Sequence, residues 1–209
     1  MNNPMDTVMY SSKVYVYSPT TQQWSSAADL PIARAHLAVV TGPDGLIYAI
    51  GGSTREFNGP DPVATVDAYN PRTNKWTSRA DMPTFRSQLG AAVGSDGRIY
   101  AVGGSDGVAA TEAVEAYTPS TDTWTAVDPL PSPINQLAVA ADKNGNVYAM
   151  HGGSVNVYKP STNAWRSLAP PPTSRLGLAA VTGTDGRIYC VGGRDYNNQV
   201  LKTVELFTP

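Results

Sequence analysis

A nine-residue string recurs four times along the chain, and this repetition constrains the fold more than any other feature. The copies are DGLIYAIGG at 44–52, DGRIYAVGG at 96–104, NGNVYAMHG at 144–152 and DGRIYCVGG at 185–193. Each copy begins with a dipeptide that favours a hairpin turn, because Asp, Asn and Gly tolerate positive φ. An apolar strand and a glycine follow, so the sequence predicts a repeated β-unit.

Aromatic markers keep fixed distances within every repeat. A tyrosine two residues before a proline is always followed by a tryptophan 7 residues later, and the tyrosine of the next string comes 24 residues after that. The tryptophans are Trp24, Trp76, Trp124 and Trp165. From the string's tyrosine to the next pre-proline aromatic the distance is 21, 17, 10 and 18 residues. Length variation is therefore confined to one segment per repeat, and the rest behaves as scaffold.

Each unit predicts four strands. A small apolar run such as HLAVV leads through the turn to IYAI, and after the variable segment come TVDAY and the tryptophan strand. No stretch shows a sustained helical period, and four-stranded units in tandem are typical of a β-propeller. We expect a single domain over 1–209. Its repeats are approximately 14–31 (partial), 32–83, 84–131, 132–170 and 171–209, the last lacking its fourth strand.

The composition narrows the partners. With 15 basic and 17 acidic residues, the chain lacks the long-range field that nucleic acid or an anionic membrane attracts, so neither is expected. The single cysteine, Cys190, cannot form an internal disulfide, and the N-terminus lacks the basic and apolar regions of a signal peptide, which favours the cytoplasm. No zinc-ligand spacing is present, and we predict no metal or cofactor.

These residues resemble the Kelch repeat. The resemblance rests on arginines at 34, 86 and 175, on Gly-[Leu/Arg]-Ile-Tyr, on glycine pairs at 51–52, 103–104 and 192–193, and on Val-x-x-Tyr-x-Pro with its distant tryptophan. It implies an all-β Kelch propeller in which the first strand of each blade lines a central channel and the fourth lies outside. Kelch domains serve mostly as binding modules, and only some are enzymes.

The third repeat and the chain ends depart from the pattern. The third repeat has His151 in place of the first glycine, Asn135 aligned with the arginines, and the shortest variable segment. The chain supplies about four four-stranded blades plus partial terminal strands, with one third strand in surplus. We expect an incomplete propeller. The alternative is a strict four-bladed ring in which the N-terminal fourth strand completes the last blade.

The variable segments are the first candidate binding surface. They occupy 53–65, 105–113, 153–156 and 194–203, and all of them join second to third strands, so they emerge on one face of a propeller. Such variation fits a scaffold that carries a varied binding surface. Unconstrained drift of surface loops is the alternative explanation.

The repeated arginines are the second candidate. Three guanidinium groups around one opening would bind carboxylates, and the resemblance implies this role, because Kelch adaptors that capture acidic peptides use arginines at this position. The structural alternative is that each arginine bonds backbone or a local acid. We select as ligand-binding candidates Arg34, Arg86, Asn135, Arg175, Ser53, Arg55, Ser105, Asp106, His151, Ser154, Arg194 and Tyr196.

We therefore expect a non-catalytic module that binds a protein, an acidic peptide or a glycan on its loop face. One alternative is a sugar-acid enzyme resembling the Kelch-type sialic-acid epimerases, with Arg86 and Arg175 holding a carboxylate. Another is a structural assembly unit that associates through its incomplete ends. The tryptophans are expected in the core, and His151 is either a titrating rim residue or drift in a degenerate repeat.

Overall fold

The computed structural model describes residues 10–56 and 59–209, and its regular structure is almost entirely β. The sheets are antiparallel and follow chain order. The first blade is a hairpin of β1 (Tyr15–Ser18) and β2 (Gln23–Ser26). The second comprises β3 (Ala38–Thr41), β4 (Ile47–Ile50), β7 (Val66–Asn70) and β8 (Lys75–Arg79). Between β4 and β7 a small hairpin is inserted, β5 (Ser53–Glu56) and β6 (Gly59–Pro62).

Three further blades complete the described chain. The third comprises β9 (Gly90–Val93), β10 (Ile99–Val102), β11 (Val114–Thr118) and β12 (Thr123–Ala126). The fourth comprises β13 (Ala138–Ala141), β14 (Val147–His151), β15 (Ser154–Lys159) and β16 (Ala164–Leu168), with the 3-10 turn η1 (Pro160–Thr162) before β16. The fifth has β17 (Ala179–Thr182), β18 (Ile188–Val191) and β19 (Val204–Phe207).

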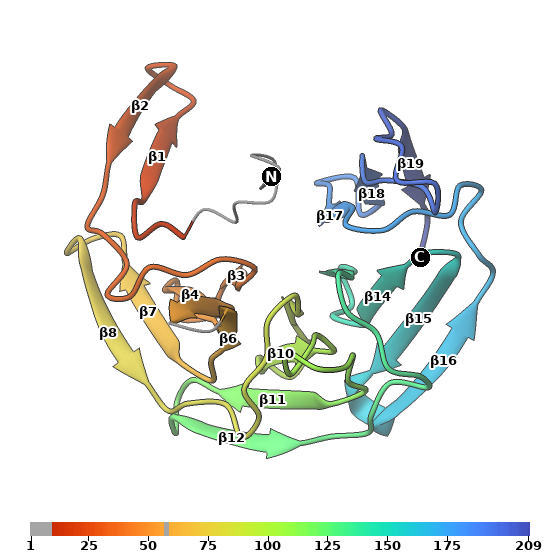
Figure 1. The fold of residues 1–209 in the computed structure, drawn as a ribbon, viewed down its shortest axis with the longest axis horizontal. Helices are drawn as coiled ribbons and strands as arrows, with labels where there is room; N and C mark the ends of the chain where they lie inside the picture. Colours follow the sequence, from red (N-terminus) through yellow and green to blue (C-terminus); the bar gives the residue numbers. More distant parts are fainter. Residues whose placement is uncertain (1–9, 57–58) are drawn as a thin grey trace.

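The blades stand side by side around a central axis, which confirms the predicted all-β Kelch propeller (Figure 1). The first strands β3, β9, β13 and β17 contact one another along the inside, and the tryptophan strands lie outside. Each first-to-second turn is held in the same way. The Asp44 carboxylate accepts the Leu46 N–H at 3.1 Å and the Tyr48 hydroxyl at 2.7 Å, while Gly45 has φ +78°. The predicted turn dipeptides are confirmed.

The core consists of the seams between neighbouring blades. Second strands are apolar on both faces because each is covered by a blade on either side, and Tyr100, Ala101 and Val102 are 0% exposed. Two seams also contain a partly buried tryptophan, Trp124 in one and Trp165 in the other. These tryptophans pack as predicted.

The ends of the arc are open. In the described part of the chain β2 pairs only with β1 and β19 only with β18, and Figure 1 shows the first and fifth blades apart. Trp24 is 70% exposed, so its assignment to the core was wrong: no earlier blade covers it in the structure. Among the described residues no helix has the length and apolar character needed to span a membrane.

Candidate functional site

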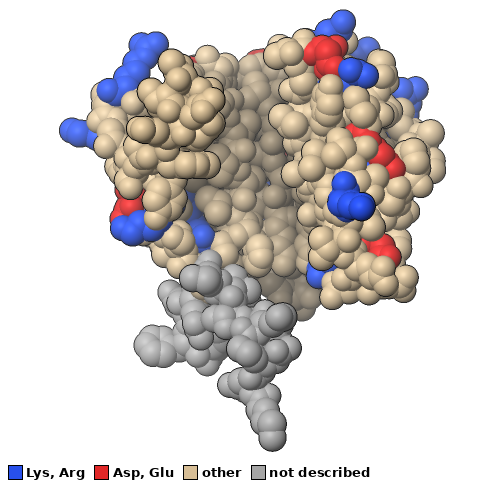
Figure 2. Space-filling view, turned by 90° about the horizontal axis from the view of Figure 1, so that it is seen from above, with Lys and Arg blue, Asp and Glu red and all other residues tan. Residues whose placement is uncertain are grey.

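The predicted loop face is present at one end of the blades. Second strands run toward this end and first strands run away from it, so it carries both the second-to-third connections and the segments that lead from one blade to the next. The Asp-Gly turns lie at the opposite end, which we call the turn face. Figure 2 looks into the open side of the arc, where a hollow runs between two flanks that carry most of the visible charged side chains.

At the loop face the central channel opens into a cavity of about 550 Å³. It is lined by His36, Leu37, Gln88, Leu89, Gln136, Leu137, Leu176, Gly177, Leu178, Gly193, Arg194 and Val200. Four of these stand at the same repeat position, and all four have the left-handed backbone: His36 at φ 55°, Gln88 at 56°, Gln136 at 50° and Gly177 at 59°. Non-glycine residues rarely adopt this conformation, so its recurrence marks a position that the architecture fixes.

The reason for that conformation is a chain of backbone hydrogen bonds around the channel. The Gln88 N–H donates to the His36 carbonyl at 2.9 Å, the Gln136 N–H to Gln88 at 3.0 Å, and the Gly177 N–H to Gln136 at 3.2 Å. Turning the backbone into the left-handed region directs these groups from blade to blade. The following leucine is then placed on the channel wall in each repeat.

Polar side chains rim this mouth. His36 is exposed, and Gln88 and Gln136 are half-buried. Arg194, on the last variable segment, donates to Gln136 Oε1 at 3.0 Å and to Asn198 Oδ1 at 2.8 Å. Its guanidinium is exposed and forms no ion pair within the described residues. The mouth therefore offers amide donors and acceptors, an imidazole and one cation.

The three repeated arginines do not rim the mouth, which corrects the expectation of an anion-seeking opening. Arg34, Arg86 and Arg175 are 1–3% exposed. Arg86 is typical: it donates to the carbonyls of Gly103 at 2.7 Å and Ala113 at 2.9 Å, and it pairs with Glu115 at 2.8 Å. Burial lowers the pKa of this guanidinium, and Glu115 opposes that effect. Each arginine instead ties the second and third strands of its own blade together.

The other two pairs follow the same design. Arg34 pairs with Asp67 at 2.7 Å, and Arg175 pairs with Glu205. Burial would raise the pKa of Glu205, but hydrogen bonds from Thr173 and Arg175 hold it below its ordinary value. The carboxylate-binding capacity that the sequence indicated is thus satisfied inside the blade. This also removes Arg86 and Arg175 as free carboxylate ligands for the sugar-acid enzyme alternative.

The alignment of Asn135 with the arginines was wrong by one residue. Ile134 lies 14 residues before Tyr148, as Arg86 lies before Tyr100, and the Gly104 N–H donates to its carbonyl as Gly52 donates to Arg86. Ile134 is 4% exposed. Its counterpart on the third strand is Asn156, in place of an acid, and Asn156 accepts from the Ser167 hydroxyl at 2.8 Å. The fourth blade has therefore replaced both members of the buried ion pair.

The same blade has a two-residue turn instead of a loop. His151 pairs with Ser154, so Gly152 and Gly153 form the turn and the segment 154–156 belongs to β15 rather than to a variable loop. The Ser154 hydroxyl donates to the His151 carbonyl at 2.9 Å. Burial lowers the pKa of His151, while backbone groups of Gln136 and Asn135 partly oppose this shift. His151 is thus a half-buried, neutral end of a strand at pH 7.

The remaining candidates serve mainly the loops themselves. Ser53 is 1% exposed, and Ser105 accepts the Gly107 N–H at 3.1 Å. Asp106 accepts the N–H groups of Val108 and Ala109, which lowers its pKa. Tyr196 is 70% exposed, with its hydroxyl close against Gly152. The side chain of Arg55 lies outside the described residues.

The site thus brings together only part of the predicted set. Of those candidates, Arg194 lines the mouth, and Tyr196 belongs to the same connection. Sequence reasoning missed Gln88 and Gln136 and did not assign His36 to a site. The available signal was their constant position two residues after Arg34, Arg86 and Ile134. No group of three or more potential metal ligands occurs within residues 10–56 and 59–209.

Comparison with known proteins agrees with this architecture. The Kelch motif matches residues 34–83, 89–131 and 175–209, more than half of the chain. The chain belongs to the Kelch-repeat family. The matched ranges leave out 132–174, the Kelch repeat in which Ile134, Asn156 and His151 replace the usual residues.

Several Kelch relatives align with parts of the chain. Kelch-like ECH-associated protein 1B of Danio rerio is 43% identical over 44% of this chain. Beta-scruin of Limulus polyphemus is 38% identical over 45%, and Kelch domain-containing protein 7A of Mus musculus is 35% identical over 46%. The aligned segments cover only 15%, 10% and 11% of those relatives' own lengths.

Proposed function

We propose that this chain is a non-catalytic binding module that holds a protein or peptide segment at the mouth of its central channel. The observation that supports this most is the composition of the mouth: hydrogen-bonding side chains at one repeated position above a leucine wall, in a cavity of about 550 Å³. Concave sites with apolar walls and a few convergent polar groups are the usual form of binding sites. The relatives fit this role, since one is named for its association with another protein.

The mouth favours a segment with backbone amides and an acidic side chain. Gln88 and Gln136 can each donate and accept, which suits the N–H and C=O groups of an extended peptide. Arg194 offers a planar cation that is already oriented by Gln136 and Asn198, which suits a carboxylate. Uneven loops make the rim asymmetric, because the fourth blade has a two-residue turn where the second blade carries β5 and β6.

The test is a fluorescence-anisotropy screen with labelled peptides, half of them acidic and half neutral. For peptides that bind, Arg194→Ala should weaken binding at least fivefold and reduce the preference for acidic sequences. The matched control is Arg187→Ala, an exposed arginine of the same blade on the turn face, paired with Asp185 at 2.7 Å. A triple Gln88→Ala, Gln136→Ala, Arg194→Ala protein that folds and keeps every ligand would contradict the proposal.

A further inference from the structure

A second surface, independent of the channel mouth, lies on the outer edge of the fifth blade. In the other four blades the strand equivalent to β19 pairs with a tryptophan strand: β1 with β2, β7 with β8, β11 with β12, and β15 with β16. Within the described residues β19 pairs only with β18. Its outer backbone groups therefore form an open edge, which favours the addition of another strand.

The paired blades show what such a strand brings. In each, the pre-proline tyrosine stands directly opposite the tryptophan, as Tyr69 does with Trp76. The four ring pairs have centroids 5.0–5.2 Å apart. Phe207 occupies the tyrosine position in β19 and contacts Tyr148 of the fourth blade at 5.4 Å, as Tyr117 contacts Tyr48 at 5.6 Å. Phe207 thus makes the contact between blades without the tryptophan contact.

The tryptophans of the second, third and fourth blades also dock on the preceding blade. Trp76 donates its indole N–H to Ala28 at 2.9 Å, Trp124 to Ala80 at 2.8 Å, and Trp165 to Asp128 at 2.9 Å, each acceptor lying four residues after the previous tryptophan. The next acceptor in this series is the carbonyl of Ala169. The seam between the fourth and fifth blades contains Phe207 but no tryptophan in the described part of the chain.

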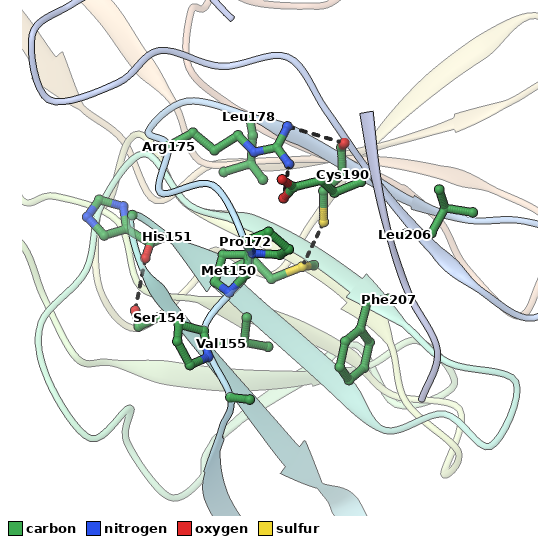
Figure 3. Close-up of a pocket in the computed structure, with 15 residues that line it drawn as sticks. Met150, His151, Ser154, Val155, Pro172, Arg175, Leu178, Cys190, Leu206 and Phe207 are labelled. Atoms are coloured by element: carbon green, nitrogen blue, oxygen red, sulfur yellow. Dashed lines mark hydrogen bonds and ion pairs between the residues drawn. The ribbon is translucent and has the colours of Figure 1, made fainter. Parts of the chain in front are cut away.

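A cavity of about 150 Å³ lies in that seam, bordered by Ala169 on one side and by Leu206 and Phe207 on the other (Figure 3). Its inner end is open for a second reason. Leu30, Met82 and Leu130 fill the corresponding positions of other seams, whereas this seam has Pro171. The lining is largely apolar, with Met150, Val155 and Leu178 among its residues. A dry cavity of this size holds a benzene-sized ring.

We propose that the edge of β19 and this cavity bind an extended strand from a partner, with a tryptophan placed opposite Phe207. The strand pairs antiparallel with β19 in the register that Tyr158 and Trp165 show. The indole enters the seam against Phe207 and donates to the Ala169 carbonyl. Backbone pairing gives general affinity for extended segments, and the indole selects among them.

The probe is a labelled peptide with the sequence of residues 159–171, KPSTNAWRSLAPP, which contains the fourth strand of the fourth blade. Anisotropy titration of the full chain should show saturable binding. Replacing the peptide tryptophan by alanine, or moving it by one position, should weaken binding at least tenfold. Phe207→Ala in the protein should also weaken it, while Tyr17→Ala, at the same position of the first blade, should not. Because the peptide variants leave the protein intact, they decide the matter even where Phe207→Ala fails to fold.

Pro171→Leu separates strand binding from capture of a small apolar molecule. Other seams hold a leucine or methionine together with a tryptophan, so peptide binding should survive this filling of the inner cavity. Loss of binding in Pro171→Leu, or equal binding of the alanine peptide, would overturn the proposal.

Two other occupants are distinguished by Trp24→Ala. Peptide binding that appears only in this variant would mean that β2 of the same chain occupies the edge. A dimer in light scattering that dissociates in this variant would assign the edge to a second copy. Either result, or no binding to the wild-type chain, would overturn the proposal.

Discussion

At the residue scale, single side chains join neighbouring blades. Asn74, Asp122 and Asn163 each occupy the left-handed position of a turn between third and fourth strands. The side-chain oxygen of Asp122 accepts the Tyr117 hydroxyl at 2.6 Å and the Ala80 N–H of the preceding blade at 2.9 Å. These two bonds lower the pKa of Asp122. One short residue thus fixes a turn, a tyrosine and a seam.

Asp122→Asn should reduce the loss of stability in acid. Because the folded pKa of Asp122 lies below its ordinary value, its contribution is present above about pH 4 and is lost as pH falls through the folded pKa. Asparagine keeps the same acceptor, as it does at Asn74 and Asn163. Urea unfolding between pH 7 and pH 3 should therefore give a shallower decline for the variant. An identical decline would contradict this assignment.

Arg86→Ile should destabilise the chain strongly, and a second substitution should restore part of the loss. Removing one partner of a buried ion pair costs about 3–5 kcal/mol, because the other charge stays buried and unpaired. The fourth blade shows a neutral solution, Ile134 with Asn156. Arg86→Ile/Glu115→Asn should therefore be more stable than Arg86→Ile alone in denaturant unfolding. Additive losses in the double variant would refute this coupling.

At the element scale, the conserved form of each blade comes from its turns and its glycine pairs. The glycine that ends each second strand in the second, third and fifth blades has positive φ, and close contacts limit what can replace it. A Cβ on Gly103 would lie 2.6 Å from the Ile134 carbonyl, while one on Gly97 in the turn would meet nothing within 4 Å. The two glycines have similar backbone angles, φ 58° and 75°, but different surroundings.

Gly103→Ala should therefore cost more stability than Gly97→Ala. Both substitutions incur the left-handed penalty of roughly 1–2 kcal/mol for a residue with a Cβ. Only Gly103→Ala also forces the third and fourth blades apart at the carbonyl of Ile134. Thermal unfolding of the two variants measures the difference. Equal melting temperatures would show that the seam yields without cost.

The blades could be predicted from the sequence to a large extent, and the candidate site only in part. Turn dipeptides and strand patterns act over a few residues, so DGRIYAVGG predicts a turn, a strand and its end correctly. Whether Arg86 faces ligand or Glu115 depends on residues 29 positions apart, which local patterns do not report. Gln88 and Gln136 were missed for the same reason: their role appears only when blades stand around an axis.

At the scale of the whole molecule, the chain is a row of seams that ends in two exposed faces. Tyr15 and Trp24 at one end are 62% and 70% exposed, and Val204 and Leu206 at the other are 52% and 48% exposed. Inner blades are covered on both sides, whereas the first and fifth are covered on one (Figure 1). In repeat architectures stability is approximately a sum of repeat and neighbour terms, so the terminal units should open first.

Native-state hydrogen exchange should show this gradient. Amides of β10 and β11 in the third blade should be the most protected, and those of β1, β2 and β19 the least, because local opening costs least where fewest contacts are broken. Addition of the tryptophan peptide should raise protection in β18 and β19 alone. Uniform protection across the blades would show instead that the arc unfolds as one unit.

The sequence by itself determined the β-unit, its repeat, its turns and the face on which its variable segments emerge. These follow from backbone preferences of Asp-Gly turns and from alternating burial, which act between near neighbours. Only the tertiary structure decided that the arginines close blades internally, that Ile134 and Asn156 replace one pair, and that the mouth is rimmed by His36, Gln88 and Gln136. Side-chain direction and burial depend on which blades meet, and that is set by packing across the whole arc.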